Sequence, residues 1–176
     1  MTRTCRPATD ADLPAIAALM DRAIGTLQTA FLSPEQIAAS RASMGLDSQL
    51  IADGTYFVVE QDGKLVGCGG WGKRATLYGG DHAAVRDDAL LDPATDAARI
   101  RAMYTDPAMA RQGVGRDLLA CCEAAARAAG FRRAEMMATL AGEPLYAACG
   151  YSVVKRVDRM SATGTAVPGA VMGKAL

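Results

Sequence analysis

Residues 98–130 read ARIRAMYTDPAMARQGVGRDLLACCEAAARAAG, and the other parts of the chain can be placed around this stretch. Up to Tyr104, apolar side chains recur at every second position, which predicts a strand. Asp106-Pro107 ends this strand, because proline cannot donate a hydrogen bond to a neighbouring strand. From Gly115 onward, apolar residues recur every three or four positions, which predicts a helix that ends at Gly130.

The turn before this helix brings two glycines and two arginines together, in the run Arg111, Gln112, Gly113, Val114, Gly115 and Arg116. The first backbone N–H groups of a helix have no partner within it, and the helix dipole makes that end positive. Glycines let an anion approach those N–H groups, and guanidinium groups suit phosphate oxygens. The run therefore predicts a phosphate or pyrophosphate site directly after a strand, although an ordinary glycine-containing helix start is the alternative.

Two common phosphate-binding motifs do not match this run. The chain has no GxxxxGK[ST] string, and the dinucleotide motif GxGxxG would need a third glycine where Leu118 stands. The type of phosphate ligand must therefore be inferred from other parts of the chain.

Composition narrows the function classes. With 176 residues, the chain is expected to form a single domain over residues 1–176. Its 19 basic and 19 acidic residues balance, which gives no reason to expect a nucleic acid partner. No apolar run is long enough to span a membrane, and no signal peptide is recognisable. The 5 cysteines lack CxxC spacing, which favours a cytoplasmic protein without a metal site or disulfide framework.

The remaining elements follow from periodicity and turn signals. Thr9 or Asp10 is expected to cap a first helix, and Ser33 a second helix that ends near Gly45. Asp62-Gly63 lies between two β-rich runs and predicts a hairpin. Strands are expected at residues 2–7, 56–60, 64–71, 131–139, 151–157 and 170–176, with a short helix at 145–149.

Three features have two interpretations each. Gly69 and Gly70 in the second hairpin strand indicate a bulge or strand end, or the close approach of a ligand. Trp71 fits core packing better than the wall of a pocket. Residues 72–97 show weak periodicity, and a connection of this length is predicted to be a lid or a loop beside the acceptor. His82 in this loop is a conceivable general base, but an exposed loop histidine is the favoured interpretation.

A second motif follows the strand at 131–139, in the run Leu145, Tyr146, Ala147, Ala148, Cys149, Gly150 and Tyr151. It resembles the aromatic-Tyr-x-x-x-Gly-Phe signature of the GNAT superfamily of N-acetyltransferases, with Tyr151 in place of the usual phenylalanine. The glycine turn resembles the acetyl-coenzyme A loop of the same family, written [QR]xxGx[GA], with Ala110 at the first position. Both motifs occur in the family's order, and the resemblance covers nearly the whole chain.

The resemblance implies an α/β fold with a mixed, mostly antiparallel sheet, in which a central parallel strand pair splays apart between flanking helices. It implies acetyl-coenzyme A as acetyl donor and no metal. The pantetheine arm would pair with the strand at Met103, Tyr104 and Thr105. A backbone N–H near Met103 or Tyr104 would polarise the thioester carbonyl, and the turn from Arg111 to Arg116 would hold the phosphates.

The resemblance also implies direct attack by a primary amine of a small acceptor, with Tyr146 as the acid that protonates the thiolate. Tyr104 is the rival donor. The base is left open between His82, a carboxylate and water. A homodimer is expected from family habit alone. Three alternatives remain: a catalytically silent acyl-coenzyme A-binding module, a phosphate-binding protein of unrelated fold, and covalent catalysis through Cys149.

Overall fold

The structure, a computed structural model, describes residues 2–84 and 86–176. Its helices are α1 (Leu13–Leu27), α2 (Pro34–Arg41), α3 (Ser48–Ala52), α4 (Val114–Ala128) and α5 (Glu143–Ala148), with short 3-10 segments η1 (Asp10–Asp12) and η2 (Pro107–Met109). Its strands are β1 (Arg3–Pro7), β2 (Tyr56–Gln61), β3 (Lys64–Gly72), β4 (Ala98–Thr105), β5 (Arg133–Thr139), β6 (Ser152–Met160) and β7 (Ala166–Ala175).

The strands form one seven-stranded sheet in the order β1-β2-β3-β4-β5-β7-β6. Every neighbouring pair is antiparallel except β4 and β5, which run parallel and are joined by the crossover helix α4. A mixed, mostly antiparallel sheet with one central parallel pair is the predicted fold class, and the prediction is confirmed.

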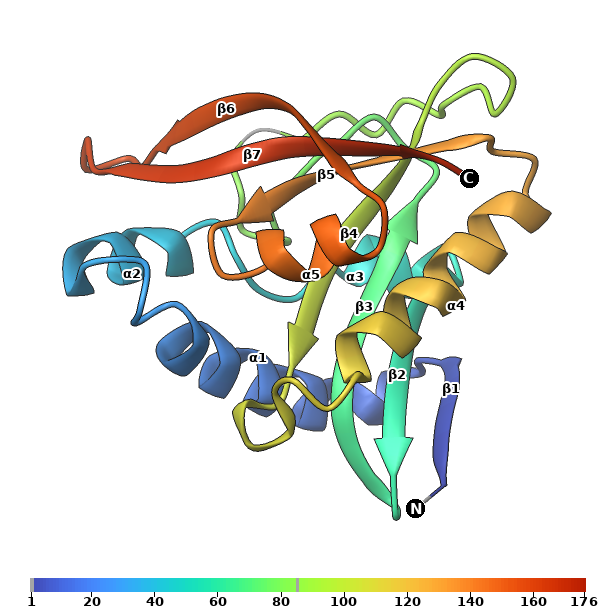
Figure 1. Cartoon of the computed structure of the whole chain (residues 1–176), viewed down its shortest axis with the longest axis horizontal. Helices are drawn as coiled ribbons and strands as arrows, with labels where there is room; N and C mark the ends of the chain where they lie inside the picture. The colour runs from blue at the N-terminus through green and yellow to red at the C-terminus, as the bar shows by residue number, and fades with distance from the viewer. Residues whose placement is uncertain (1, 85) are drawn as a thin grey trace.

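The central parallel pair is very short. β4 and β5 pair only at Ala98 with Ala134 and at Arg99 with Glu135. Beyond these residues β4 continues to Thr105 beside β3, whereas β5 continues to Thr139 beside β7. Figure 1 shows the two strands diverging, so the sheet is split into two arms that share one end.

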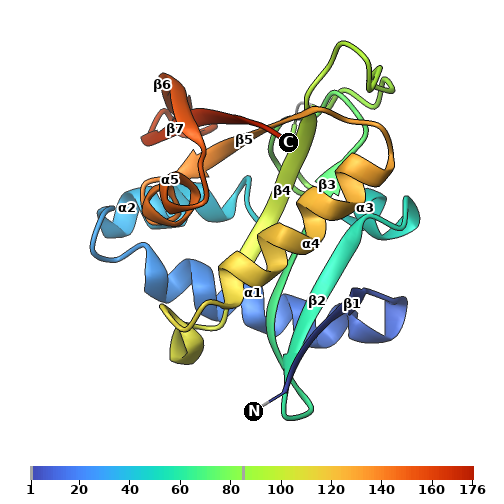
Figure 2. The ribbon, with the colours of Figure 1, turned by 45° about the vertical axis from the view of Figure 1, so that its right-hand side comes forward.

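The larger arm consists of β1, β2, β3 and β4, and helices α1 and α4 cover its opposite faces (Figure 2). On one face α4 packs Val114 and Leu118 against Val59. On the other face α1 packs Ile16 and Leu19 against Val58. Adjacent residues of a strand point to opposite faces of the sheet. Val58 of β2 therefore packs against α1, and its neighbour Val59 packs against α4.

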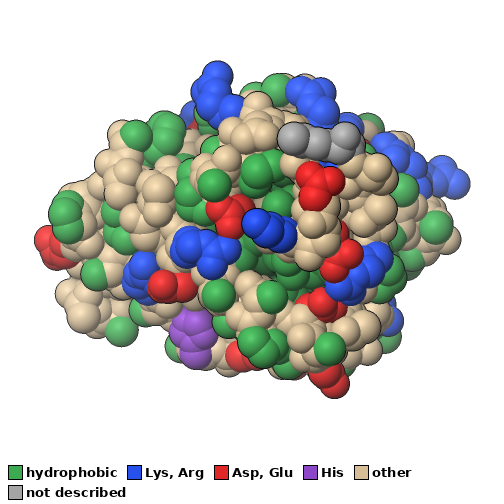
Figure 3. Space-filling model, turned by 90° about the horizontal axis from the view of Figure 1, so that it is seen from below, with side chains coloured by type: hydrophobic (Ala, Val, Ile, Leu, Met, Phe, Trp, Pro, Cys, Tyr) green, Lys and Arg blue, Asp and Glu red, His purple; other side chains and the backbone are tan. Residues whose placement is uncertain are grey.

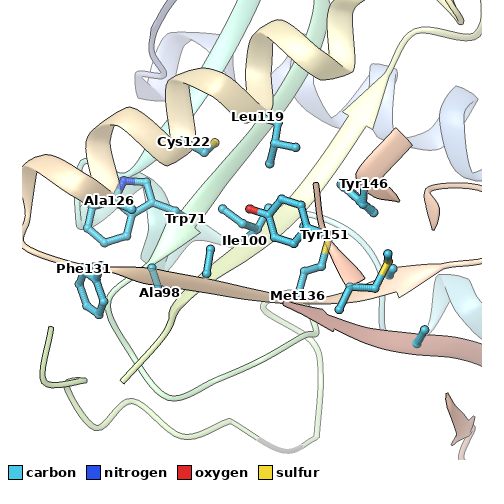
Figure 4. Packing of buried hydrophobic residues seen from close by; sticks show 14 residues of the cluster. Trp71, Ala98, Ile100, Leu119, Cys122, Ala126, Phe131, Met136, Tyr146 and Tyr151 are labelled. Atoms are coloured by element: carbon cyan, nitrogen blue, oxygen red, sulfur yellow. The ribbon is translucent and has the colours of Figure 1, made fainter. Parts of the chain in front are cut away.

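A third cluster fills the space where the two arms meet (Figure 4). At one end Trp71 makes an edge contact with Phe131, with ring centroids 5.7 Å apart. At the other end Tyr146 makes a similar contact with Tyr151 at 6.2 Å. Trp71 is therefore a core residue, as the favoured interpretation predicted.

Local signals were confirmed where they involve neighbouring residues. The hydroxyl of Ser33 accepts a hydrogen bond of 3.2 Å from the N–H of Gln36, so it caps α2 as predicted. The helix ends at Arg41 rather than near Gly45, and the short helix α3 was not predicted. β6 and β7 are longer than predicted, because they pair with each other up to Met160 and Ala166, where the sequence alternates little.

Candidate active site

The site begins at an irregularity in β4 opposite Gly69. Cys68 pairs with Tyr104 and Gly70 with Arg101, so Ala102 and Met103 together face Gly69. Ala102 has a φ of 50°, a left-handed conformation that costs an L-residue roughly 1–2 kcal/mol. A β-bulge of this kind turns backbone groups away from the ladder and is typical of functional sites.

Two neighbours hold the bulge in place. The hydroxyl of Tyr56 donates a hydrogen bond of 3.0 Å to the carbonyl of Ala102. A side chain at Gly69 would lie 2.6 Å from the sulfur of Met103, so only glycine fits opposite the bulge. The glycine-rich part of β3 therefore reflects a bulge and the close packing of neighbouring strands.

The turn that is predicted to hold phosphates, from Arg111 to Arg116, follows η2 and leads into α4. Arg111 and Gly113 have left-handed φ angles of 62° and 87°, and Gly113 immediately precedes the first residue of the helix. The side chains of Arg111 and Arg116 are exposed. Within residues 2–84 and 86–176, neither side chain forms a hydrogen bond or ion pair, so both guanidinium groups are free for an anion.

Arg3 adds a third guanidinium group that the sequence did not reveal. Its Nη1 lies 2.6 Å from a carboxylate oxygen of Asp117, and its Nη2 donates a hydrogen bond of 3.0 Å to the carbonyl of Gln112. It thereby balances an acidic side chain in the first turn of α4 that would repel a phosphate. The side chain of Gln112 bonds to Ala108.

The two glycines of the turn have different structural reasons. Gly113 needs its left-handed φ, and a side chain there would meet only Nη1 of Arg3, at 3.5 Å. A side chain at Gly115 would lie 2.7 Å from the terminal Cδ2 of Leu145 of α5 and would displace that side chain, so Gly115 allows α4 and α5 to pack closely. The sequence-based explanation, in which both glycines leave room for a phosphate, gives no account of this contact of Gly115.

A cavity of about 710 Å³ connects the turn with the bulge and with α5. We refer to it as the larger cavity. Of the predicted site residues, all but Gln112 line it: Met103, Tyr104, Thr105, Arg111, Gly113, Val114, Gly115, Arg116 and Tyr146. The cavity enters the gap between β4 and β5, where β4 has no ladder partner on the β5 side.

A second cavity of about 100 Å³ lies on the other side of Tyr146, and we refer to it as the smaller cavity. Met44, Met103, Tyr104, Thr139 and Tyr146 line both cavities. The smaller cavity is also bounded by residues 77–80 of the long loop. The long loop therefore lies close to Tyr146, where the larger cavity adjoins the smaller one.

Tyr146 and Tyr104 stand where the two cavities meet. Burial raises the pKa of both phenols well above the ordinary value, so both are protonated at neutral pH. The oxygen of Tyr104 accepts a hydrogen bond of 3.1 Å from the N–H of Gly45. The hydroxyl of Tyr146 has no hydrogen-bond partner within the described ranges, so it is available to donate a proton.

A buried ion network holds the long loop against β4. Asp47 and Arg101 are 1% and 5% exposed, and their closest side-chain atoms lie 2.6 Å apart. Arg101 also donates to the carbonyls of Thr76 and Gly79, and Arg86 donates to the other oxygen of Asp47. Burial lowers the pKa of Arg101, and the charge of Asp47 opposes that shift. The loop wall of the smaller cavity is therefore fixed by charges.

A model of the acetyltransferase (GNAT) family matches residues 20–151. The chain belongs to the GNAT acetyltransferase family. The comparison with curated protein sequences gives no match.

Solved structures of GNAT proteins share the fold. A GCN5-related N-acetyltransferase from Rhodopseudomonas palustris is 23% identical with a TM-score of 0.74, over 100% of this chain and 97% of the other. The PaiA N-acetyltransferase from Thermoplasma acidophilum, in complex with coenzyme A, is 13% identical with a TM-score of 0.67, over 100% of both chains. YncA from Salmonella typhimurium, a putative acetyltransferase with acetyl-coenzyme A, is 19% identical with a TM-score of 0.66, over 100% and 95%.

Two residues considered at the outset lie away from both cavities of this GNAT protein. His82 is exposed, visible as the purple patch in Figure 3, and its Nε2 lies 3.2 Å from the carbonyl oxygen of Arg41. Cys149 lies at the end of α5 and lines neither cavity.

Among the described residues of this GNAT chain, no group of three or more His, Cys, Asp or Glu side chains is arranged to hold a metal ion. No helix within the same residues is long and apolar enough to cross a membrane.

Proposed function

We propose that the chain is an N-acetyltransferase that transfers the acetyl group of acetyl-coenzyme A to a primary amine of a small acceptor by direct attack. The observation that supports this most is the position of Tyr146, which lines both cavities at their junction. One cavity suits the donor and the other the acceptor, so the proton donor stands between the two substrates.

Acetyl-coenzyme A fits the residues of the larger cavity. The phosphates would be held by the backbone of the turn, with the free guanidinium groups of Arg111 and Arg116 beside them. The unpaired side of β4 at Met103 to Thr105 suits the amide groups of an extended arm, in the manner of strand addition. Acetyl-coenzyme A, when bound, supplies an activated acetyl thioester.

The chain's own groups would then assist the transfer. A new C–N bond forms as the amine attacks, the C–S bond breaks, and the thiolate takes a proton from the hydroxyl of Tyr146. A backbone N–H near Met103 or Tyr104, at the bulge, would stabilise the carbonyl oxygen as it gains charge. Burial raises the pKa of Tyr146, which makes its hydroxyl a weaker acid. The same apolar surroundings raise the pKa of the coenzyme A thiol, so its thiolate is a stronger base and the proton transfer stays feasible.

Water would receive the proton of the amine. Among the described residues that line the two cavities, none is an aspartate, a glutamate or a histidine. No side chain of the cleft is therefore suited to the role of general base, and His82 lies outside it. An amine that arrives neutral, or loses its proton to solvent, satisfies this requirement.

Thiol release with acetyl-coenzyme A tests the proposal. Turnover would be measured across amino acids, polyamines, aminoglycosides and peptide N-termini, with the chain's affinity for acetyl-coenzyme A measured in parallel. We expect thiol release that depends on one class of amine, together with a stoichiometric acetylated product. Tight binding of acetyl-coenzyme A without turnover on any amine would instead identify a silent acyl-coenzyme A-binding protein.

A further inference from the structure

Arg159 lines the smaller cavity, and its guanidinium group has neither a hydrogen-bond partner nor an ion-pair partner among the described residues. It lies on β6 opposite Val167 of β7. Its Nε and Nη2 are shielded from solvent and make no hydrogen bond with any residue in the described ranges. No carboxylate in those ranges forms an ion pair with it. Shielding part of a charged group from water without a partner is costly, and a ligand that bonds to these nitrogens would offset that cost.

The other arginine of the smaller cavity differs from Arg159 in this respect. Arg101 is fully engaged by Asp47 and by two loop carbonyls. On the same strand as Arg159, Arg156 forms a two-bond pair with Glu143. Arg159 is thus the arginine of this cavity that has charge to offer to a small molecule.

The surroundings of Arg159 favour an anion and hold the side chain in place. The ring of Tyr78 lies 5.7 Å from its Cζ, a cation–π distance that fixes the guanidinium plane without neutralising it. Burial lowers the pKa of Arg159, while Tyr78 and Tyr104 oppose that shift. With no acidic side chain among the described lining residues, the cavity attracts negative charge.

We propose that Arg159 binds a carboxylate of the acceptor, so that the acceptor is a small aminocarboxylate such as an amino acid. This inference rests on the proposed function and assigns the substrate class of the same site. Tyr146 and Arg159 line one cavity, so an amine near the first and a carboxylate on the second fit one small molecule.

The size of the cavity limits the acceptor. Engineered cavities of about 150 Å³ hold benzene, so the roughly 100 Å³ here accommodates only a few heavy atoms beyond the shared wall. A guanidinium fork matches the two oxygens of a carboxylate, and the apolar floor at Ile100 and Met136 suits a short aliphatic body. A polyamine or an aminoglycoside would bring positive charge to Arg159 and is disfavoured.

The first test compares each amino acid with its own primary amide. The two acceptors share the amine and the body, and only the acid has the carboxylate. The carboxylate also raises the pKa of its neighbouring amine, which leaves less neutral amine for the acid. We nevertheless expect kcat/KM to favour the acid by about tenfold or more, the size of a charge-assisted hydrogen bond. Equal or better use of the amides would overturn the inference.

The second test replaces the residue. In Arg159→Gln we expect the KM of the preferred acid to rise by about 10–100-fold, and the KM of its amide and the affinity for acetyl-coenzyme A to stay unchanged. Lys155→Gln is the matched control, since it removes one positive charge from an exposed position of the same strand. An acid-to-amide preference that survives in Arg159→Gln would overturn the inference.

A stability measurement separates binding from a structural role. In Arg159→Met the unpaired charge is gone while the aliphatic stem stays, so the thermal midpoint of the free protein should rise. A midpoint that falls by several degrees would show that Arg159 supports the fold and would overturn the inference.

Calorimetric titration distinguishes the failure of this inference from failure of the proposed function. Amino acids and their amides would be titrated onto the full chain saturated with coenzyme A. If no amine gives thiol release, the proposed function fails, yet acid-selective binding that Arg159→Gln abolishes would still support the carboxylate site. If thiol release occurs and binding shows no preference for acids, the carboxylate site alone fails.

Discussion

The larger and the smaller cavity adjoin each other but are built differently. One side of the larger cavity is a continuous segment, from Met103 to Leu118, whose backbone turns twice through left-handed conformations, and its other walls come from α1 and from residues 139–146. The smaller one is bounded by side chains from β4, β5, β6 and the long loop, held by the buried pair of Asp47 and Arg101. Recognition should therefore depend on backbone shape in the first cavity and on placed charges in the second.

We expect the largest effect on activity from a substitution at Tyr146, where the two cavities meet. Tyr146→Phe keeps the ring that packs on Tyr151 and removes only the hydroxyl. We expect kcat to fall by about 10²–10⁴-fold, the usual contribution of a positioned acid, in single-turnover measurements where chemistry limits the rate. Affinity for acetyl-coenzyme A and the thermal midpoint should be unchanged. A rate constant within about threefold of wild type would assign the acid role to Tyr104 or to water.

We expect the next largest effect, on the free energy of unfolding, from a substitution in the charge network of Asp47, Arg101 and Arg86. Asp47→Asn leaves the guanidinium of Arg101 buried without a counter-charge, which should cost about 3–5 kcal/mol in the free energy of unfolding measured in urea. Asp21→Asn is the control, because its pair with Arg41 is exposed and should contribute about 0–1 kcal/mol. Equal losses in the two variants would show that burial of the network carries no special stability.

Under conditions where Asp47→Asn stays folded, the same variant sharpens the comparison of the cavities. Its acceptor KM should rise while its affinity for acetyl-coenzyme A stays near wild type, since the network holds only the wall of the smaller cavity.

At Gly113, beside the larger cavity, we expect the affinity for acetyl-coenzyme A to depend on both the backbone conformation and the charge of the side chain. Gly113→Asp places a carboxylate at the phosphate turn, and we expect affinity for acetyl-coenzyme A to fall at least about tenfold, or 1.4 kcal/mol. Gly113→Ala is the matched control, since it has the same strain at a φ of 87° without the charge. If the two variants lose affinity equally, strain is the cause. If the aspartate variant binds normally, the phosphate assignment is wrong.

His82 should give the smallest effect. In His82→Ala we expect kcat, and the affinity for acetyl-coenzyme A, to stay within about threefold of wild type, because the ring is exposed and lies outside both cavities. Any change should appear in the acceptor KM, since the loop borders the smaller cavity. A fall in kcat by about a hundredfold would restore the histidine as the base.

The sequence predicted the side of the larger cavity that runs from Met103 to Arg116, because these residues are neighbours in the chain, whereas the wall that α1 provides was not among the predicted site residues. The glycine turn, the strand that ends at Thr105 and the short helix with Tyr146 each have a local pattern that the structure reproduces. Even so, Gly115 packs against Leu145, which lies 30 residues further along the chain in another helix. A local sequence pattern does not predict such a contact.

The smaller cavity could not be predicted, because the charged side chains that form its wall are paired with residues far away in the sequence. Asp47 is 54 positions from Arg101 and 39 positions from Arg86. In the sequence, Arg159 looks the same as Arg156, and only the fold gives one a carboxylate and leaves the other without. Pairing of this kind depends on tertiary structure, so a single sequence carries no signal for it.

The short pairing of β4 with β5 gives this sheet an edge in its interior. Unpaired strand edges are hazards for aggregation when they face solvent, because any other strand can add to them. Here the unpaired side of β4 faces the gap between the two arms, and the larger cavity enters this gap. In the proposed complex, an extended arm paired with β4 would cover this edge and hinder other strands from adding to it.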